Sequence, residues 1–403
     1  MNLALTSCFK RAYVNTTPLA CIPSNLNILH DQVFFFSLAP YLCQRAIPFS
    51  TNALYNLLPL DANLQNTNED TIMAAFGSLF MPKMALTSFD GQTWQTPKMV
   101  PSDSISLHPG AHVLHYSSTC FEGLKAFRQA DGSVKIFRMD KNIARLMQSS
   151  QLLTLPSFDP EMLAQMIRDT VALFAKDVPE APGSLYIRPT HFGTEPAIGK
   201  AAAPSLQSML YVLVSPVGDY FAGGDRALRI KLEEDGMRCA PHMGVIKSGG
   251  NYASAMRPIL EAKAECNADQ VLFCPGGDVQ ETGAANFLLI DGNEIITKAL
   301  DSTFLHGVTR DSILTLARDL GMQVSERELS VKELLERAAK PGCEAALSGT
   351  AAVLTPVGTL IYQGKEHSIG NGGIGQTTLK LRRALNDIQW GRSPDTHGWL
   401  TQP

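Results

Sequence analysis

From Met73 onward the apolar positions follow two periods, one typical of strands and the other typical of helices. In residues 121–139 two apolar-rich runs flank an Asp-Gly turn, which predicts a β-hairpin. Residues 286–298 repeat this arrangement around Asp291 and Gly292 and predict a second hairpin. β-Branched and aromatic residues predict further strands over 184–189, 208–217, 228–234 and 270–277.

Helices are predicted where apolar residues return every three or four positions. Residues 140–153 have this spacing behind Asp140, a candidate N-cap, and a second helix is predicted over 312–321. Residues 342–358 are rich in small side chains and predict a loop and a strand, and a last helix lies near the C-terminus. Strands and helices therefore alternate irregularly, which indicates a mixed α/β (α+β) fold.

At 403 residues the chain exceeds the usual size of one domain, so we expect two. Pro, Gly and Asp interrupt the apolar pattern in residues 215–224, the best candidate for a linker. This linker separates a small α/β domain, residues 73–214, from a larger domain, residues 225–395. Residues 396–403 are expected to form a tail.

The N-terminal stretch differs from the rest in composition. Residues 1–72 are poor in Gly and rich in Asn, Leu and Pro, with little periodicity, so we expect an extension outside the folded core. One interpretation is an over-long start choice, with the protein beginning at Met73. The other is an organelle transit peptide, which the scarcity of Arg disfavours. The apolar run 33–43 is too short to span a membrane.

Charge and cysteine usage exclude several classes of function. The chain has 34 Lys and Arg against 38 Asp and Glu, and it has no run of basic residues that could bind a phosphate backbone. Nucleic acid is therefore not an expected partner. The eight cysteines are scattered, without a CxxC pair or zinc-ligand spacing, which predicts thiols in a reducing compartment and no metal site. We expect a cytoplasmic protein without a membrane partner.

One lysine stands in a setting that suits covalent chemistry. Lys247 follows Val245 and Ile246 and precedes two glycines in VIKSGGNY. Glycines let a backbone approach a flat ligand, and apolar neighbours lower the pKa of an amine that must attack a carbonyl. Taken alone, a lysine in such a loop is more often solvated and inert.

Other residues could serve a flat, phosphorylated cofactor. Glu281 precedes small residues in VQETGAANF, where a carboxylate could meet a protonated ring nitrogen, although a turn carboxylate is the commoner role. The backbone N–H groups of Val308 and Thr309 open a predicted helix and could seat an anion. Arg145 lies off the apolar stripe of its helix and could bind the same phosphate.

Two segments could bind carboxylates of a substrate. Tyr186 and Arg188 lie two residues apart on a predicted strand, so their side chains share one face of the sheet. A surface pair is an equally plausible interpretation. The small-residue loop 348–352 could hold a carboxylate with its N–H groups, or form a tight turn.

In this order the segments resemble the branched-chain amino-acid aminotransferases, of the class IV pyridoxal-phosphate fold. The resemblance runs from about Met73 to about Gly391, through HYSSTCFEGLKAFR, YIRPTHFGTEPAIG, KSGGNYASA, QETGAANF, LHGVTRDSIL and ALSGTAAVLTPVG. It implies a two-domain fold of type IV with pyridoxal 5′-phosphate at the domain interface.

The resemblance also implies roles at the cofactor. Lys247 would form the internal aldimine and later move the proton between the substrate α-carbon and the cofactor C4′. Glu281 would pair with the pyridine nitrogen, and Tyr252 would hydrogen-bond the phenolic oxygen. The remaining cofactor-binding residues would be Arg145, Val308, Thr309 and Thr350, the first three at the phosphate.

The substrate-binding residues that the resemblance implies are Tyr116, Phe121, Tyr186, Arg188, Thr350 and Ala351. The last two would bind the α-carboxylate, and Tyr186 with Arg188 would accommodate the distal carboxylate of glutamate. Tyr116 would be lent to the neighbouring subunit of a homodimer. The implied reaction is ping-pong transamination of L-leucine, L-isoleucine and L-valine with 2-oxoglutarate to give branched-chain 2-oxo acids and L-glutamate.

Departures and competing interpretations limit the resemblance. Ala352 and Thr355 stand where some relatives have a CxxC redox pair, so thiol control is not expected there, and Ala284 replaces a hydroxyl residue near the pyridine contact. D-amino-acid aminotransferases and aminodeoxychorismate lyases of the same fold use an equivalent lysine and glutamate. A cofactor-free Schiff-base aldolase and a non-enzymatic assembly protein are the alternatives outside this chemistry.

Overall fold

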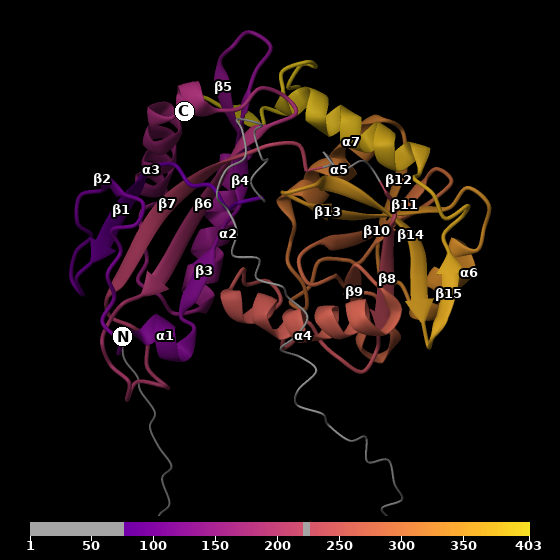
Figure 1. Cartoon of the computed structure of the whole chain (residues 1–403), viewed down its shortest axis with the longest axis horizontal. Coiled ribbons are helices and arrows are strands. Elements are labelled where there is room, and N and C mark those ends of the chain that lie inside the picture. Colours follow the sequence, from indigo (N-terminus) through magenta and orange to yellow (C-terminus); the bar gives the residue numbers. More distant parts are fainter. Residues whose placement is uncertain (1–75, 221–225) are drawn as a thin grey trace, which may run out of the picture. The chain divides into compact units, whose positions relative to one another are not determined.

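The computed structural model describes residues 76–220 and 226–403 (Figure 1). The predicted extension 1–72 and the start at Met73 lie outside the described residues, as does the end of the predicted linker. The described residues belong to one compact unit, residues 71–403. The division into domains at residues 215–224 therefore stays a prediction.

The first sheet has eight strands and is built almost entirely from residues before 218. Its order is β16-β5-β4-β6-β7-β1-β2, with β3 paired to β6. The strands are β1 (Lys83–Phe89), β2 (Lys98–Pro101), β3 (Thr119–Phe121), β4 (Leu124–Arg128), β5 (Val134–Phe137), β6 (Ser184–Gly193), β7 (Ser208–Val217) and β16 (Leu400–Thr401). The predicted hairpin 121–139 is confirmed as the antiparallel pair β4 and β5. The C-terminal strand β16 returns to pair with β5.

The second sheet also has eight strands, and it uses residues after 227. Its order is β12-β11-β10-β13-β14-β8-β9, with β15 paired to β14. The strands are β8 (Leu228–Glu233), β9 (Gln270–Phe273), β10 (Asn286–Asp291), β11 (Glu294–Thr297), β12 (Gln323–Glu326), β13 (Glu344–Gly349), β14 (Val353–Tyr362) and β15 (Lys365–Ser368). The predicted hairpin 286–298 is confirmed as β10 and β11. With the helices below, the two sheets confirm the mixed α/β class.

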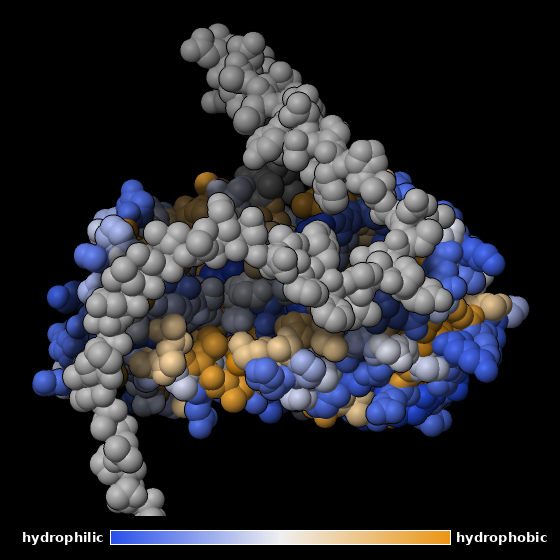
Figure 2. Space-filling view, turned by 90° about the horizontal axis from the view of Figure 1, so that it is seen from below, coloured by the Kyte–Doolittle hydropathy of each residue, from blue (hydrophilic) through white to orange (hydrophobic). Residues whose placement is uncertain are grey.

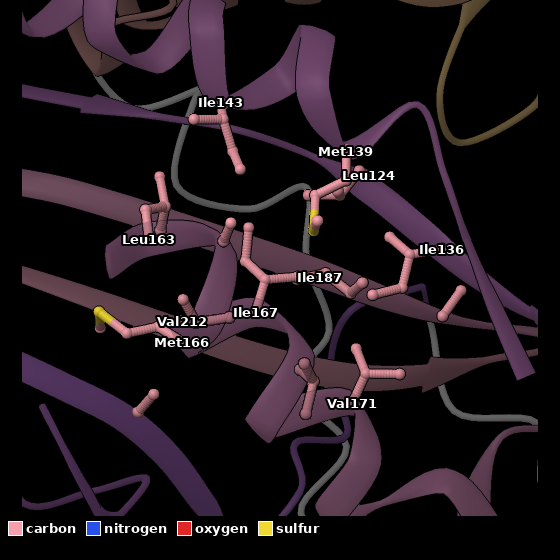
Figure 3. Packing of buried hydrophobic residues seen from close by; sticks show 14 of the residues in the cluster. Leu124, Ile136, Met139, Ile143, Leu163, Met166, Ile167, Val171, Ile187 and Val212 are labelled. Carbon is pink, nitrogen blue, oxygen red and sulfur yellow. The ribbon is translucent and has the colours of Figure 1, made fainter. Parts of the chain in front are cut away.

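The described residues form seven α-helices. They are α1 (His112–Tyr116), α2 (Met139–Leu152), α3 (Pro160–Leu173), α4 (Gly249–Cys266), α5 (Val308–Asp319), α6 (Val331–Ala338) and α7 (Gln376–Gln389). Helices α2 and α3 bury their apolar faces against the first sheet, where Ile143, Leu163 and Ile167 pack among strand residues such as Ile187 (Figure 3). Helices α5 and α7 pack on the second sheet. Among the helices of the described ranges, none combines the length and apolarity that crossing a bilayer requires.

The prediction that Asp140 caps its helix is wrong. Helix α2 begins at Met139, and Arg138 is the N-cap residue with φ of 52°. Arg138 is held by parts of the chain distant in sequence, since its N–H donates to the Trp399 carbonyl (2.7 Å) and its guanidinium pairs with Asp311 (2.7 Å). Asp140 lies in the first turn, where the helix dipole favours a carboxylate. Tertiary contacts therefore set this helix end.

Candidate active site

Lys247 lies immediately before α4 and next to strand β3 of the first sheet. Its backbone carbonyl accepts a hydrogen bond from the Phe121 N–H on β3 (3.0 Å). Its amine donates to the Tyr252 hydroxyl (2.6 Å) and lies 5.2 Å from the centre of the Phe121 ring. Because α4 begins two residues after Lys247, Tyr252 in its first turn turns back toward the amine. Three predicted site residues are thus brought together.

Glu281 is buried beside this group and is held by three donors. Its carboxylate pairs with the Arg238 guanidinium (2.8 Å) and accepts hydrogen bonds from the Leu305 N–H (2.9 Å) and the Asn286 amide (3.3 Å). Burial raises the pKa of Glu281 to about 7, while Arg238 and the Leu305 N–H oppose that shift. The site therefore holds a carboxylate that can share a proton near neutral pH.

Arg238 was not found by sequence reasoning. Its side chain is 1% exposed, and its guanidinium carbon lies 5.5 Å from the centre of the Tyr252 ring. One of its terminal nitrogens is buried and has no hydrogen-bond partner among the described residues. Nothing in the segment GMRCAPH distinguishes this arginine from a solvated one. Its role became visible only when folding placed it against Glu281.

Arg145 forms a bidentate ion pair with Glu122, a second residue that sequence reasoning missed. The two N–O distances are 2.6 and 2.8 Å, and the Asn142 amide donates to the same carboxylate at 2.7 Å. A third donor of Arg145 goes to the His306 carbonyl (2.8 Å), just before α5. Glu122 lies in FEGLKAFR, where neither charge nor spacing marks it as the partner of Arg145. Two of the five N–H donors of a guanidinium are left after these three bonds.

The first turn of α5 and the loop after β13 face a common pocket. Val308 and Thr309 open α5, where backbone N–H groups have no partner within the helix. They line this pocket together with Gly123 and Thr350. The Thr350 hydroxyl donates to the Gly123 carbonyl (3.1 Å). The predicted phosphate seat and the predicted carboxylate loop are therefore adjacent.

Ala351 is held by a buried lysine that the sequence did not single out. The Lys125 amine on β4 donates to the Ala351 carbonyl (2.9 Å). Burial lowers the pKa of Lys125 to about 8, and Asp219 opposes that shift. The loop that follows β13 is thereby tied to the first sheet.

Tyr186 and Arg188 share one face of β6, as predicted. Arg188 donates to the Tyr186 hydroxyl (2.8 Å) and lies 4.6 Å above the Phe121 ring. Both border a cavity of about 320 Å³, with Phe76 packed edge-on against Tyr186 at 5.1 Å. Phe76 is a fourth residue that sequence reasoning missed. At Gly123 a Cβ atom would lie 2.0 Å from the Tyr186 hydroxyl, so only glycine permits this packing.

Tyr116 makes contacts with a different set of residues. It ends α1, its hydroxyl donates to the Ile198 carbonyl, and its ring lies 4.8 Å from that of His112. Of the twelve predicted site residues, it is the one that these contacts do not connect to Lys247 or its neighbours.

Comparison with known proteins identifies the family of the chain. Residues 119–360 match the family model "Amino-transferase class IV". The chain is 38% identical to the "Probable branched-chain-amino-acid aminotransferase" of Streptomyces coelicolor, over 87% of this chain and 99% of that protein. It is 37% identical to "Branched-chain-amino-acid aminotransferase 2" of Bacillus subtilis, over 83% and 93%.

Solved structures show the same likeness. A branched-chain amino acid aminotransferase crystallised with pyridoxamine 5′-phosphate superposes with a TM-score of 0.66 at 27% identity, over 79% of this chain and 97% of that one. The branched-chain amino acid aminotransferase of Escherichia coli superposes with a TM-score of 0.66 at 26% identity, over 79% and 98%.

Proposed function

The chain belongs to the class IV aminotransferases, and within them to the branched-chain-amino-acid aminotransferases with pyridoxal phosphate as cofactor, and from this premise we propose its substrates and the roles of its residues. The amino donors are L-leucine, L-isoleucine and L-valine, and the acceptor is 2-oxoglutarate. The observation that carries the proposal is Lys247, whose amine lies 2.6 Å from the Tyr252 hydroxyl beside the buried Glu281.

The residues present fit pyridoxal phosphate. The cofactor needs an amine at its aldehyde carbon, a carboxylate at its ring nitrogen and an anion seat at its phosphate. Lys247 and Glu281 supply the first two. The first turn of α5, beginning at Val308, and the two remaining donors of Arg145 supply the third. The orphaned buried nitrogen of Arg238 adds a donor beside Glu281.

Lys247 holds the cofactor and moves a proton. When bound, pyridoxal phosphate supplies an electron sink for the electron pair left on the substrate α-carbon. Lys247 Nζ takes the α-proton and returns it at the cofactor C4′. The Tyr252 hydroxyl, 2.6 Å from Nζ, orients that amine, and the Phe121 ring covers it at 5.2 Å. These two contacts would hold the amine in a defined position for proton transfer.

Glu281 keeps a proton on the ring nitrogen. A buried carboxylate with a pKa of about 7 and a partner cation at 2.8 Å is suited to this, because it can accept a hydrogen bond from a protonated ring while staying paired with Arg238. Arg238 also fixes the carboxylate in place. The loss of either residue weakens the electron sink.

The substrate meets two kinds of group. Thr350 and Ala351 bind its α-carboxylate in the loop after β13. The cavity beside Tyr186 and Arg188 takes leucine-like side chains against Phe76, and it offers Arg188 to the distal carboxylate of glutamate. One pocket thereby serves both half-reactions of the ping-pong cycle.

We propose a homodimer in which Tyr116 reaches the partner's site. The support is that the contacts of Tyr116 on α1 are with Ile198 and His112 and not with the residues around Lys247. Exposed apolar side chains, Leu114 on α1 and Met256 and Leu260 on α4, lie on these two helices. Figure 2 shows hydrophobic residues gathered on the face seen from below. Mixing inactive Lys247→Ala and Tyr116→Ala chains restores activity if the site is shared, and restores none if each chain uses its own Tyr116.

We also propose a cytoplasmic location, supported by the five described cysteines, which are all unpaired. Cell fractionation with an antibody against the protein tests it, and recovery with an organelle or a membrane would contradict it.

Lys247→Ala tests the proposed chemistry. Turnover of L-leucine with 2-oxoglutarate is expected to be abolished, with the melting temperature and oligomeric state retained. The matched control is Lys263→Ala, which removes an exposed lysine from α4 and leaves turnover at the wild-type level. Unchanged turnover in Lys247→Ala would sink the assignment.

A further inference from the structure

The backbone of Lys247 is fixed by two hydrogen bonds, one to strand β3 of the first sheet and one to helix α2, which packs on that sheet. Its carbonyl accepts the Phe121 N–H at 3.0 Å, and its N–H donates to the Ser149 hydroxyl on α2 at 3.2 Å. The next residue, Ser248, forms an isolated antiparallel bridge with Cys120 on β3. Residues 247 and 248 thus lie alongside β3, and α2 holds the Lys247 N–H.

Ser149 lies on α2, the helix that also carries the site residue Arg145. It is fully buried, and it lies one turn after Arg145, which pairs with Glu122 on the segment that follows β3. Residues i and i+4 of a helix share a face, so α2 presents Arg145 and Ser149 to the same side. The helix is itself fixed by its packing on the first sheet.

A neighbouring serine of the same helix makes different contacts. Ser150 is also buried, and its hydroxyl lies 2.9 Å from Nδ1 of His191 and 3.4 Å from the Cys120 sulfur. His191 continues to the Ser208 hydroxyl at 3.0 Å. These contacts join α2 to β3, β6 and β7 and do not include Lys247.

We propose that Ser149 is a positioning residue for the proton transfer by Lys247. The proposal rests on the proposed role of Lys247. The chain at Lys247 is a loop between a turn and α4, so no regular ladder holds its N–H. Without the Ser149 hydroxyl the Lys247 N–H loses its partner, and the segment is held on the β3 side alone, by the Phe121 N–H and the Ser248–Cys120 bridge. The Lys247 amine is then positioned less firmly, and small displacements of a reacting group cost large factors in rate.

The experiment compares Ser149→Ala with Ser150→Ala, two deletions of one hydroxyl from adjacent buried positions of one helix. For Ser149→Ala, kcat for L-leucine, normalised to bound cofactor, is expected to fall about tenfold or more, with KM changed much less. The isotope effect on kcat with α-deuterated L-leucine is expected to rise, because proton transfer has become slower. The pH at which the visible band of the bound cofactor titrates is also expected to shift.

Ser150→Ala is expected to lower the melting temperature while keeping the wild-type isotope effect and titration. If both variants lose kcat equally and both keep the wild-type isotope effect, Ser149 is a packing residue and the inference fails. Failure of the proposed function is a separate outcome, since it appears as turnover in Lys247→Ala. Should Ser149→Ala not fold, amide hydrogen exchange of the wild-type holoenzyme decides: a slowly exchanging Lys247 N–H supports the bond, and a rapidly exchanging one overturns it.

Discussion

Replacing Glu122 by Gln should destabilise the protein far more than its modest change in structure suggests. The Glu122 side chain is 1% exposed, and it neutralises an Arg145 side chain that is 9% exposed. Burial alone raises the pKa of Glu122, but Arg145, Lys247 and Asn142 outweigh it and hold that pKa below its usual value. The Glu122→Gln change keeps the volume and, in the cofactor-free protein, leaves Arg145 as a buried cation without the carboxylate that neutralises it. Breaking a buried pair in this way costs about 3–5 kcal/mol.

The assay is urea unfolding of the cofactor-free protein, and Glu161→Gln is its control. Glu161 pairs with Arg168 on α3, but the two side chains are 72% and 26% exposed, so loss of that pair costs less than about 1 kcal/mol. Glu122→Gln should also weaken pyridoxal phosphate binding, because it releases the guanidinium that we place at the phosphate. The reasoning is refuted if both variants lose the same free energy of unfolding.

Three further predictions follow from single contacts. Gly123→Ala should raise KM for 2-oxoglutarate about tenfold and KM for L-leucine less, because the new methyl displaces the Tyr186 hydroxyl from Arg188. Steady-state kinetics of the double variant with Tyr186→Phe check this cause: partial recovery of KM supports it, and no recovery contradicts it. Burial lowers the pKa of His191 to about 3. As the pH falls from about 6.5 toward 3, this histidine is therefore protonated in the unfolded chain and still neutral in the folded one. The free energy of unfolding therefore decreases over that pH range. Urea unfolding of His191→Gln at several pH values should show a dependence of this free energy on pH that is weaker by about 1.4 kcal/mol per pH unit. An unchanged dependence argues for an accessible histidine. Glu281→Gln should lower kcat about 100-fold in single-turnover kinetics, and a variant within twofold of wild type would remove the carboxylate from the mechanism.

Most strands could be predicted from the sequence, because the alternation of side chains that marks a strand is set by residues close together in the chain. The hairpins 121–139 and 286–298 carry both strands and their turns within a few residues, and both are present. The N-terminal end of α2 was predicted at Asp140 and lies one residue earlier, since contacts of Arg138 with Trp399 and Asp311 decide it. Pairing between distant segments is invisible to periodicity.

The candidate site divides in the same way. Lys247 and Tyr252 stand five residues apart in one motif, so the sequence brought them together before the structure did. Glu122, Arg238 and Lys125 each act through a partner far along the chain, and the motif around each gave no charge or spacing signal. Ser149 illustrates the point, because a serine on a helix face reads as ordinary until its hydroxyl is found against the backbone of Lys247.

The visible absorption spectrum of the purified protein, recorded before and after addition of L-leucine and then of 2-oxoglutarate, tests the central claim most directly. The proposed roles of Lys247 and Glu281 predict a cofactor band that bleaches with L-leucine and returns with 2-oxoglutarate, which would show donor, acceptor and ping-pong order in one cuvette. A cofactor band that ignores L-leucine would contradict the proposed substrates, and a protein that shows no such band after addition of pyridoxal phosphate would contradict the site itself.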